Sequence, residues 1–350
     1  DLTPAAITIN TIATDDVINA AEKGADLTLS GTTTNVEPGQ TVTVTFGGKN
    51  YTASVASDGS WTATVPAADL ASLPEGSASA QASVSNINGN SASAVHNYSI
   101  DSSAPTIIIN TVASDNIVNA SEADAGVTVS GSTTAEAGQI VTVTLNSPTV
   151  QTYQATVQAD GSWSINIPAA DLEALTDGSH TLTATVNDKA GNPASTTHNL
   201  AVDLTVPVLT INTIAGDDII NAAEHGQALV ISGSSTGGEA GDVVTVTLNS
   251  KTYTTTLDAS GNWSVGVPAA DVTALGSGPQ TVTATVTDAA GNSDNETHTV
   301  TVNLAAPTIG INTIATDDVI NATEKGADLQ ISGTSNQPAG TTITLTLNGQ

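Results

Sequence analysis

Three features of the sequence predict a tandem array of all-β modules of the immunoglobulin-like sandwich type. Two sets of landmark residues recur at intervals of 100 to 102 residues, which indicates duplication of a whole module. Short runs of Val, Ile, Leu and Thr alternate with polar residues, as in half-buried strands. Turn signals of Gly, Pro and Asp separate the runs, and seven such strands per repeat are typical of a sandwich. The landmarks are Asn10, Asn110, Asn212 and Asn312, and Trp61, Trp163 and Trp263.

The spacing of the landmarks predicts four modules, at residues 1–101, 102–203, 204–303 and 304–350. The fourth copy reaches Gln350 before its tryptophan is due, so we expect a truncated fourth module. The chain also opens inside a repeat. We therefore expect an internal fragment of a longer protein, with any targeting signal outside it.

Within module 1, the alternation of apolar and polar residues predicts each strand. A polar loop, Thr14–Asp26, separates the first two strands and is called the A–B loop. Its Asn19-Ala-Ala-Glu22 segment matches a capping box for one helical turn. Pro66–Leu70 predicts another helical turn, because proline suits the first helical position. The strands are expected at Ile7–Ala13, Leu27–Thr33, Thr41–Phe46, Tyr51–Ala56, Trp61–Val65, Ala78–Val84 and Ala92–Ile100, with Trp61 in the core.

The composition limits the class of partner. The chain has 34 acidic residues against 5 basic ones, a net charge of −29. Such a surface repels nucleic acid and anionic membranes, whose binding requires Lys and Arg, and it favours divalent cations. There is no cysteine, so no disulfide holds the modules together. No apolar run is long enough for a membrane span, and we expect no membrane insertion.

The direction of the strands brings acidic segments together where consecutive modules meet. The A–B loop lies at the end of a module where the chain leaves it. The loop between the last two strands, called the F–G loop, lies at the opposite end. Each junction should therefore combine the A–B loop of one module, the linker and the F–G loop of the next. The residues concerned are Asp15, Asp16, Glu22, Asp101 and Asp188 at the first junction, Asp115, Asn116, Glu122, Asp203 and Asp288 at the second, Asp217, Asp218, Glu224 and Asn303 at the third, and Asp317, Asp318 and Glu324 in the fourth copy.

Carboxylates gathered in this way repel one another unless a cation lies among them. Ca²⁺ takes about 6–8 hard oxygen ligands in flexible geometry, and Asn and backbone carbonyls can complete its shell. We therefore expect Ca²⁺ to bind between modules and to stiffen the chain into a rod. The alternative is structural, because Asp and Asn are ordinary turn residues and the acids would then only solubilise the surface.

The sequence lacks the motifs of common enzymes, and we expect no catalysis. It contains no Gly-x-Ser-x-Gly elbow, no phosphate-binding loop and no Gly-x-Gly-x-x-Gly segment. His96, His198 and His298 recur at one position of the last strand, which favours a satisfied strand histidine over a metal or catalytic role. Tyr51, Tyr153 and Tyr253 also recur, and cross-strand packing is favoured there over a sugar-stacking platform.

Four motifs together resemble a known family. They are Asp-Asp-x-Ile-Asn-Ala-x-Glu, Gly-x-Trp, Pro-Ala-Ala-Asp and Asp-x-Ala-Gly-Asn. The combination resembles the bacterial Ig-like repeats of giant non-fimbrial adhesins of Gram-negative bacteria, of the SiiE and BapA type found among biofilm-associated proteins. The resemblance covers the three complete modules and the truncated fourth. Module 1 departs from it, since Asn86-Ile87-Asn88-Gly89-Asn90 replaces the last motif.

The resemblance implies type I secretion, display outside the cell on the bacterial surface, and a long rod with calcium near the module boundaries. It implies that the rod projects a distal adhesive region for cell adhesion or biofilm formation. Neighbouring modules are then the direct partners, while host-cell glycans or surfaces are contacted by regions outside this chain. Two alternatives stay open: an array of carbohydrate- or receptor-binding modules, and the non-catalytic tail of a secreted enzyme.

Overall fold

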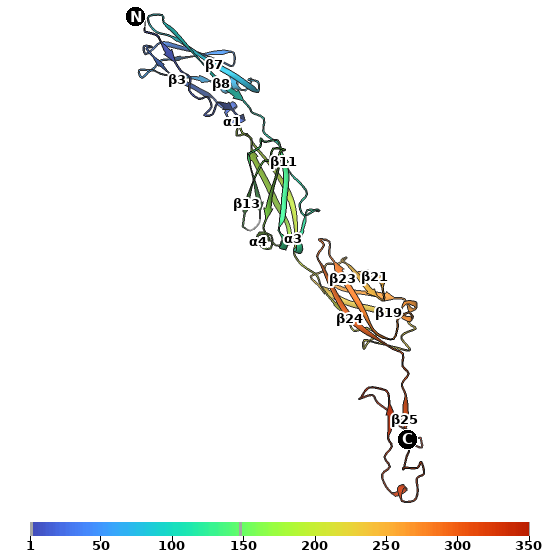
Figure 1. The fold of residues 1–350 in the computed structure, drawn as a ribbon. Coiled ribbons are helices and arrows are strands. Elements are labelled where there is room, and N and C mark those ends of the chain that lie inside the picture. The colour runs from blue at the N-terminus through green and yellow to red at the C-terminus, as the bar shows by residue number, and fades with distance from the viewer. Residues whose placement is uncertain (1–2, 147–148, 350) are drawn as a thin grey trace. The chain divides into compact units, whose positions relative to one another are not determined.

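The computed structural model describes residues 3–146 and 149–349, and in them the regular secondary structure is almost all short strands (Figure 1). The predicted all-β class of tandem immunoglobulin-like sandwiches is confirmed. The chain divides into two compact units, Asp1–Leu204 and Thr205–Gln350. Because this division separates only two units, the module boundaries at 101, 203 and 303 stay predictions.

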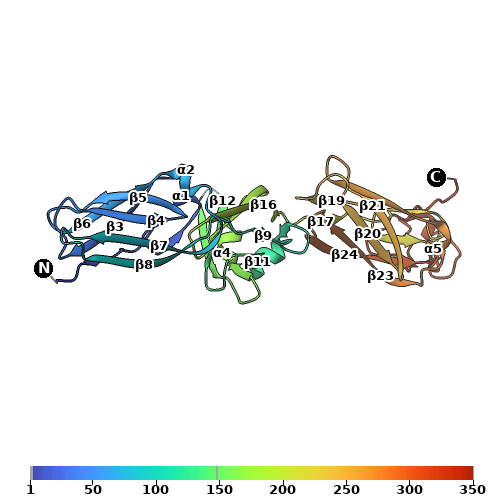
Figure 2. The ribbon, with the colours of Figure 1, turned by 90° about the horizontal axis from the view of Figure 1, so that it is seen from above.

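Module 1 forms two facing sheets. The first has the order β1-β3-β6 and the second β2-β8-β7-β4-β5. Figure 2 labels strands β3 to β8 of this module. Alternate residues of both sheets point inward, and Trp61, Leu29 and Val44 lie in the core between them. The elements are β1 (Ala6–Ile7), β2 (Val17–Ile18), α1 (Ala20–Lys23), β3 (Leu27–Thr34), β4 (Thr41–Phe46), β5 (Lys49–Ser54), β6 (Ser60–Val65), α2 (Ala67–Leu70), β7 (Gly76–Ser85) and β8 (Ser91–Ile100).

Six of the seven predicted strands fall within two residues of their expected bounds, and the A–B region differs most. Strand β1 covers only Ala6–Ile7, although backbone hydrogen bonds to β3 continue as far as Asn10 N–H, which donates to Ser30 O. Ala13 and Thr14 have positive φ values of 51° and 71°, so the chain turns there and cannot remain extended. Beyond this turn, β2 pairs in parallel with β8, a strand that the prediction of a plain loop missed.

Modules 2 and 3 repeat this arrangement, with sheets β14-β11-β9 and β10-β16-β15-β12-β13, then β17-β19-β22 and β18-β24-β23-β20-β21. The elements of module 2 are β9 (Ile107–Ile109), β10 (Ile117–Asn119), α3 (Ala120–Ala125), β11 (Val127–Thr133), β12 (Ile140–Asn146), β13 (Gln151–Thr156), β14 (Ser162–Ile167), α4 (Ala169–Leu172), β15 (Gly178–Asn187) and β16 (Pro193–Asp203). Those of module 3 are β17 (Val208–Ile211), β18 (Ile219–Asn221), β19 (Leu229–Thr236), β20 (Val243–Leu248), β21 (Lys251–Thr256), β22 (Asn262–Val267), α5 (Ala269–Thr273), β23 (Gly278–Thr287) and β24 (Ser293–Asn303).

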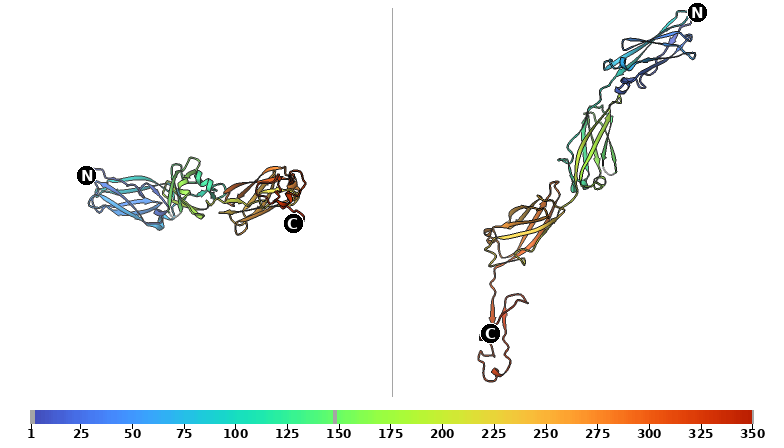
Figure 3. Two further views of the ribbon diagram at one scale, coloured as in Figure 1. Left: turned by 90° about the horizontal axis from the view of Figure 1, so that it is seen from below. Right: turned by 180° about the vertical axis from the view of Figure 1, so that it is seen from behind.

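The segment after β24 has little regular structure in its described residues (Figure 3). Strands β25 (Ile309–Ile311) and β26 (Gly333–Ser335) pair with each other, and a 3₁₀ turn, η1, covers Glu324–Gly326. Apolar residues that are buried at matching positions of the complete modules, such as Ile320 and Leu345, are here exposed. A sandwich core needs both sheets, so this part of the chain buries few apolar side chains.

Candidate cation site at the first junction

The aspartates of the A–B loop bind the backbone of their own loop. Asp15 Oδ1 accepts from Val17 N–H at 3.0 Å, and Asp16 Oδ1 accepts from Ile12 N–H at 2.8 Å. Asp16 also lies 2.6 Å from His96 Nε2 on β8. The Ile12 N–H and then the His96 side chain hold the pKa of Asp16 below its usual range. Asp16 therefore closes the turn that feeds β2.

The same contacts recur in the later modules and account for the recurring histidines. His298 Nε2 lies 2.6 Å from Asp218 Oδ1, and His198 Nε2 lies 2.7 Å from Asn116 Oδ1. An amide oxygen can replace a carboxylate here because the contact needs only an acceptor. In modules 2 and 3 and in the fourth copy, the backbone N–H two residues later donates to the side chain of Asp115, Asp217 or Asp317. Asp318 accepts a hydrogen bond from Ile314 N–H.

The predicted capping boxes are present. Asn19 and Glu22 exchange side-chain and backbone hydrogen bonds at the start of α1, and Asn119 and Glu122 do the same at α3. Glu224 and Glu324 accept from Asn221 N–H and Asn321 N–H, each at 3.0 Å. Each of these glutamates uses Oε2 in this way, and a carboxylate has further lone pairs for another partner.

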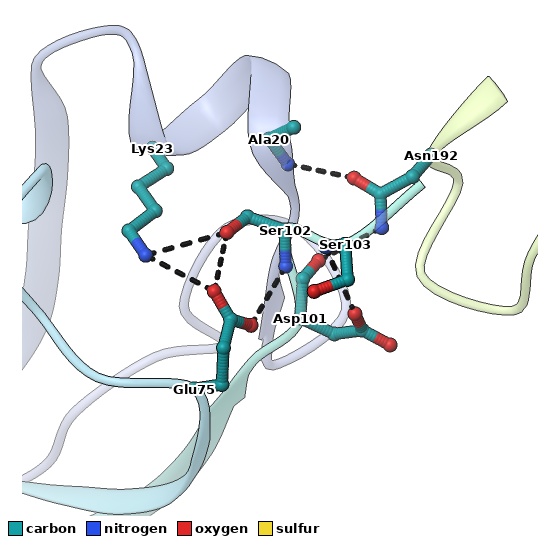
Figure 4. Close-up of polar contacts among 7 residues, drawn as sticks. All are labelled: Ala20, Lys23, Glu75, Asp101, Ser102, Ser103 and Asn192. Atoms are coloured by element: carbon teal, nitrogen blue, oxygen red, sulfur yellow. Dashed lines mark hydrogen bonds and ion pairs between the residues drawn. The ribbon is translucent and has the colours of Figure 1, made fainter. Parts of the chain in front are cut away.

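Asn192, in the F–G loop of module 2, joins the two modules of the unit Asp1–Leu204. Its Oδ1 accepts from Ala20 N–H at the start of α1, at 2.8 Å, and its Nδ2 donates to the Asp101 carbonyl oxygen at 2.9 Å (Figure 4). The same Nδ2 donates to Asp188 Oδ2 at 2.9 Å, and Asn192 N–H donates to Asp188 Oδ1. Asn192 is 1% exposed and Asp188 is 7% exposed. The amide thus connects the A–B loop, the linker and the F–G loop.

Sequence reasoning missed Asn192. Its signal was the final residue of the Asp-x-Ala-Gly-Asn motif, which was interpreted through its aspartate alone. Asp288 and Asn292 repeat the internal contacts of this loop in module 3, with Asn292 N–H donating to Asp288 Oδ1 at 2.8 Å. Two hydrogen bonds between one aspartate and one asparagine hold the loop in the same shape in both modules.

The structure brings some of the predicted ligands together and leaves others apart. Asp101 and Asp188 both contact Asn192, and Glu22 lies in the helix whose Ala20 N–H contacts it. Asp15 and Asp16 instead bind within their own loop. Within residues 3–146 and 149–349, no group of three or more Asp, Glu or His side chains stands in metal-binding geometry. Asp203 and Asn303 end β16 and β24, and Asn303 Oδ1 accepts from Ala305 N–H.

The chemistry of the donors at the first junction suits a hard cation. The Asp101 and Asp188 carboxylates, the Glu22 carboxylate and the Asn192 amide oxygen are all oxygen ligands of the kind that Ca²⁺ takes. Asp101 Oδ1 accepts only a long bond, 3.3 Å, from Ser103 N–H. Both the calcium site and its ligands stay predictions.

A second recurring polar contact lies at the Pro-Ala-Ala-Asp turn. Tyr51 Oη donates to Asp69 Oδ2 at 2.8 Å, and Lys49 Nζ lies 2.5 Å from Asp69 Oδ1. Tyr153 donates to Asp171 and Tyr253 to Asp271 in the same way. Lys49 and then Tyr51 lower the pKa of Asp69. The contact fastens the α2 turn to β5.

These tyrosines should titrate late. Burial and then the Asp69 carboxylate raise the pKa of Tyr51 to about 12, and burial and then the Asp271 carboxylate raise the pKa of Tyr253 to about 12. A raised folded-state pKa gives stability that is complete below about pH 10, the unfolded value, and is lost as the pH rises through 12. An ultraviolet titration of tyrosinate should show this delay, whereas the chain in denaturant should titrate near pH 10. Asp69→Asn should lower the pKa of Tyr51. An identical titration of folded and unfolded chains would contradict the prediction.

Comparisons with known proteins agree with the fold. A family model described as a bacterial Ig-like domain matches residues 103–204 and 231–304, and one described as a bacterial Ig-like domain of group 3 matches residues 168–255. No curated protein matches the chain. The chain belongs to the family of bacterial Ig-like domains.

Solved structures of adhesin repeats resemble the chain in sequence. A Ca²⁺-stabilized adhesin of an Antarctic bacterium that binds ice is 36% identical, over 96% of this chain and 84% of that one, with a TM-score of 0.45. A 1.5-MDa bacterial ice-binding adhesin is 35% identical, over 87% of this chain and 100% of that one, with a TM-score of 0.43. An immunoglobulin-like domain of the M. primoryensis ice-binding adhesin is 42% identical, over 28% of this chain and 99% of that one, with a TM-score of 0.24.

The chain is thus similar in sequence to parts of bacterial adhesins. Among the described residues, no helix combines the length and the apolar character that a membrane crossing requires.

Proposed function

We propose that this chain is a spacer segment of a bacterial cell-surface adhesin, stiffened by Ca²⁺ bound between modules. The observation that carries the proposal is the convergence on Asn192 of the A–B loop, the linker and the F–G loop, which come from two modules. The modules share one set of landmark residues and one sheet arrangement, which favours spacing over recognition. The tyrosine hydroxyls donate to aspartates of the Pro-Ala-Ala-Asp turn, which gives these side chains a structural role within each module.

In this proposal Glu22, Asp101 and Asp188 hold the cation at the first junction, with Asn192 Oδ1 or the Asp101 carbonyl oxygen completing the set. When bound, the ion supplies positive charge that removes the repulsion among the carboxylates. The protein groups supply the geometry, because they come from three segments that cannot all meet one ion unless the junction adopts one orientation. The identity to a Ca²⁺-stabilized adhesin supports the same choice of metal.

The proposal extends to the setting of the chain. We infer that the longer protein is exported by type I secretion and that the rod projects a distal region for adhesion or biofilm formation. The distal region makes any contacts with host-cell glycans or surfaces. Each module of this chain has its neighbouring modules as partners.

Calorimetric titration with Ca²⁺ and small-angle scattering test the function together. We expect saturable binding, a rise in melting temperature by mass action and a longer maximum dimension with Ca²⁺ than with a chelator. Asp101→Asn should weaken binding at the first junction by about tenfold or more, because the charge count of the ligands sets the affinity. Asp58→Asn is the matched control, since Asp58 only accepts from Ser60 in a hairpin turn. A maximum dimension that ignores the chelator would overturn the proposal.

A further inference from the structure

Ser102, which follows Asp101 in the linker, is bound to module 1 by its own set of contacts. Ser102 N–H donates to Glu75 Oε2 at 2.9 Å, and the Ser102 hydroxyl donates to Glu75 Oε1 (Figure 4). Lys23 Nζ lies 3.1 Å from Glu75 Oε1 and 3.3 Å from Ser102 Oγ. Three segments of module 1 thus meet at the linker: α1, the loop before β7, and the chain that leaves β8.

These contacts fix both the backbone and the side chain of Ser102. Both oxygens of Glu75 engage the same residue, one through the main chain and one through the hydroxyl. Charge-assisted hydrogen bonds are about twice as strong as neutral ones. Lys23 is only 17% exposed, so its charge is partly withdrawn from water, while Glu75 is 45% exposed. The Ser102 hydroxyl, then the Ser102 N–H and then Lys23 keep the pKa of Glu75 low, so the contacts are present at neutral pH.

Module 2 contains a similar arrangement. Asp177 precedes Gly178 at the start of β15, as Glu75 precedes Gly76 at the start of β7. Asp177 Oδ1 accepts from Leu204 N–H at 2.7 Å, at the matching linker position. In module 3 the position holds Ser277, which has no carboxylate. The residue before this glycine therefore differs between the modules. Its carboxylate accepts hydrogen bonds from the linker in modules 1 and 2, and module 3 has no carboxylate there.

We propose that Glu75 and Lys23 clamp Ser102 to module 1 without any metal ion, so that the bendable part of the first linker begins only after Ser102. None of the predicted calcium ligands takes part in these contacts, although Lys23 follows Glu22 and Ser102 follows Asp101, so the clamp does not require an ion. An ion at the junction would then control only how module 2 attaches to a linker that is already fixed as far as Ser102.

Amide hydrogen exchange of Ser102 in the full chain, followed by NMR in excess chelator, tests the clamp. In the unmodified chain the Ser102 amide should stay protected without metal. Glu75→Gln should lower this protection by about tenfold, because it replaces a charged acceptor pair with one neutral acceptor. Lys23→Gln should lower it less. Glu37→Gln is the matched control, because Glu37 also accepts from a backbone N–H of module 1, that of Ile87, but far from the linker.

The outcomes separate this proposal from the proposed function. Exchange of Ser102 at the rate of a free peptide in chelator, or no effect of Glu75→Gln, would overturn the clamp and leave calcium binding unaffected. Protection that survives the chelator in a chain that binds no calcium would support the clamp and sink the proposed function. Unchanged protection of β7 and β8 amides in Glu75→Gln would show that the module remains folded.

Discussion

Replacing Asn192 by alanine should cost about 2–3 kcal/mol in the free energy of opening the first junction, the price of unpaired buried polar groups. The change removes the partners of Ala20 N–H and of the Asp101 carbonyl, and it takes the side-chain donor from Asp188, which is buried. Because 1.4 kcal/mol corresponds to a factor of ten, exchange of the Ala20 amide should accelerate by about thirtyfold or more. Spin labels on modules 1 and 2 should show a broader distance distribution.

Two further variants make this expectation sharper. Asn90→Ala changes the matching loop position of module 1 and should leave the Ala20 amide unaffected. Asn192→Asp places a second carboxylate beside Asp188, so the junction should open further in chelator and recover when Ca²⁺ is added. An Ala20 amide that exchanges equally in the unmodified chain and in Asn192→Ala would contradict the assigned role of the amide.

Substituting Gly233 by alanine should destabilise module 3 by about 3 kcal/mol or more, as overpacking at a close backbone approach does. A Cβ at this position would overlap the Thr210 carbonyl oxygen and lie 2.6 Å from Cζ2 of Trp263. Neither group can withdraw, because Thr210 belongs to β17 and Trp263 is buried between the sheets. Calorimetry of the full chain should show one transition at lower temperature, and the amides of β19 should exchange faster.

Gly266 supplies the matched control on the adjacent strand β22. A Cβ there meets nothing within 4 Å, and the backbone does not require a positive φ. Gly266→Ala should therefore be neutral or slightly stabilising, because alanine restricts the unfolded chain. Equal loss of stability in the two variants would show that the contact with tryptophan is not what selects glycine. Gly31 and Gly131 face Trp61 and Trp163 in the same way.

The strands and turns could be predicted from the sequence because their signals are local. Alternation placed β4 at its observed bounds, Thr41–Phe46, and the capping box at Asn19–Glu22 was correct. Strand β2 was missed because two residues are too few to establish a period, and its pairing with β8 spans more than eighty positions of the chain. Such long-range pairing leaves no trace in the spacing of residues.

The candidate site was predicted less completely. The meeting of the A–B loop, the linker and the F–G loop followed from strand direction alone. The contacts that each side chain makes did not follow from strand direction, because the same aspartate can either cap a turn or hold a cation. Asp16 closes a turn in which Ala13 and Thr14 have positive φ. Asn192, a neutral residue, joins the modules. Charge counting directs attention to carboxylates and overlooks the amide that connects them.

The parallel pairing of β2 with β8 determines how a module responds to tension. Ser99 N–H donates to Asp16 O at 2.8 Å and Asp101 N–H donates to Ile18 O at 3.0 Å, at the end where the chain leaves the module. A force applied along the chain draws β2 and β8 in opposite senses along their shared direction. The bonds between them are therefore loaded in shear, and they must fail together rather than one after another. Pairs β10–β16 and β18–β24 give the next two modules the same resistance.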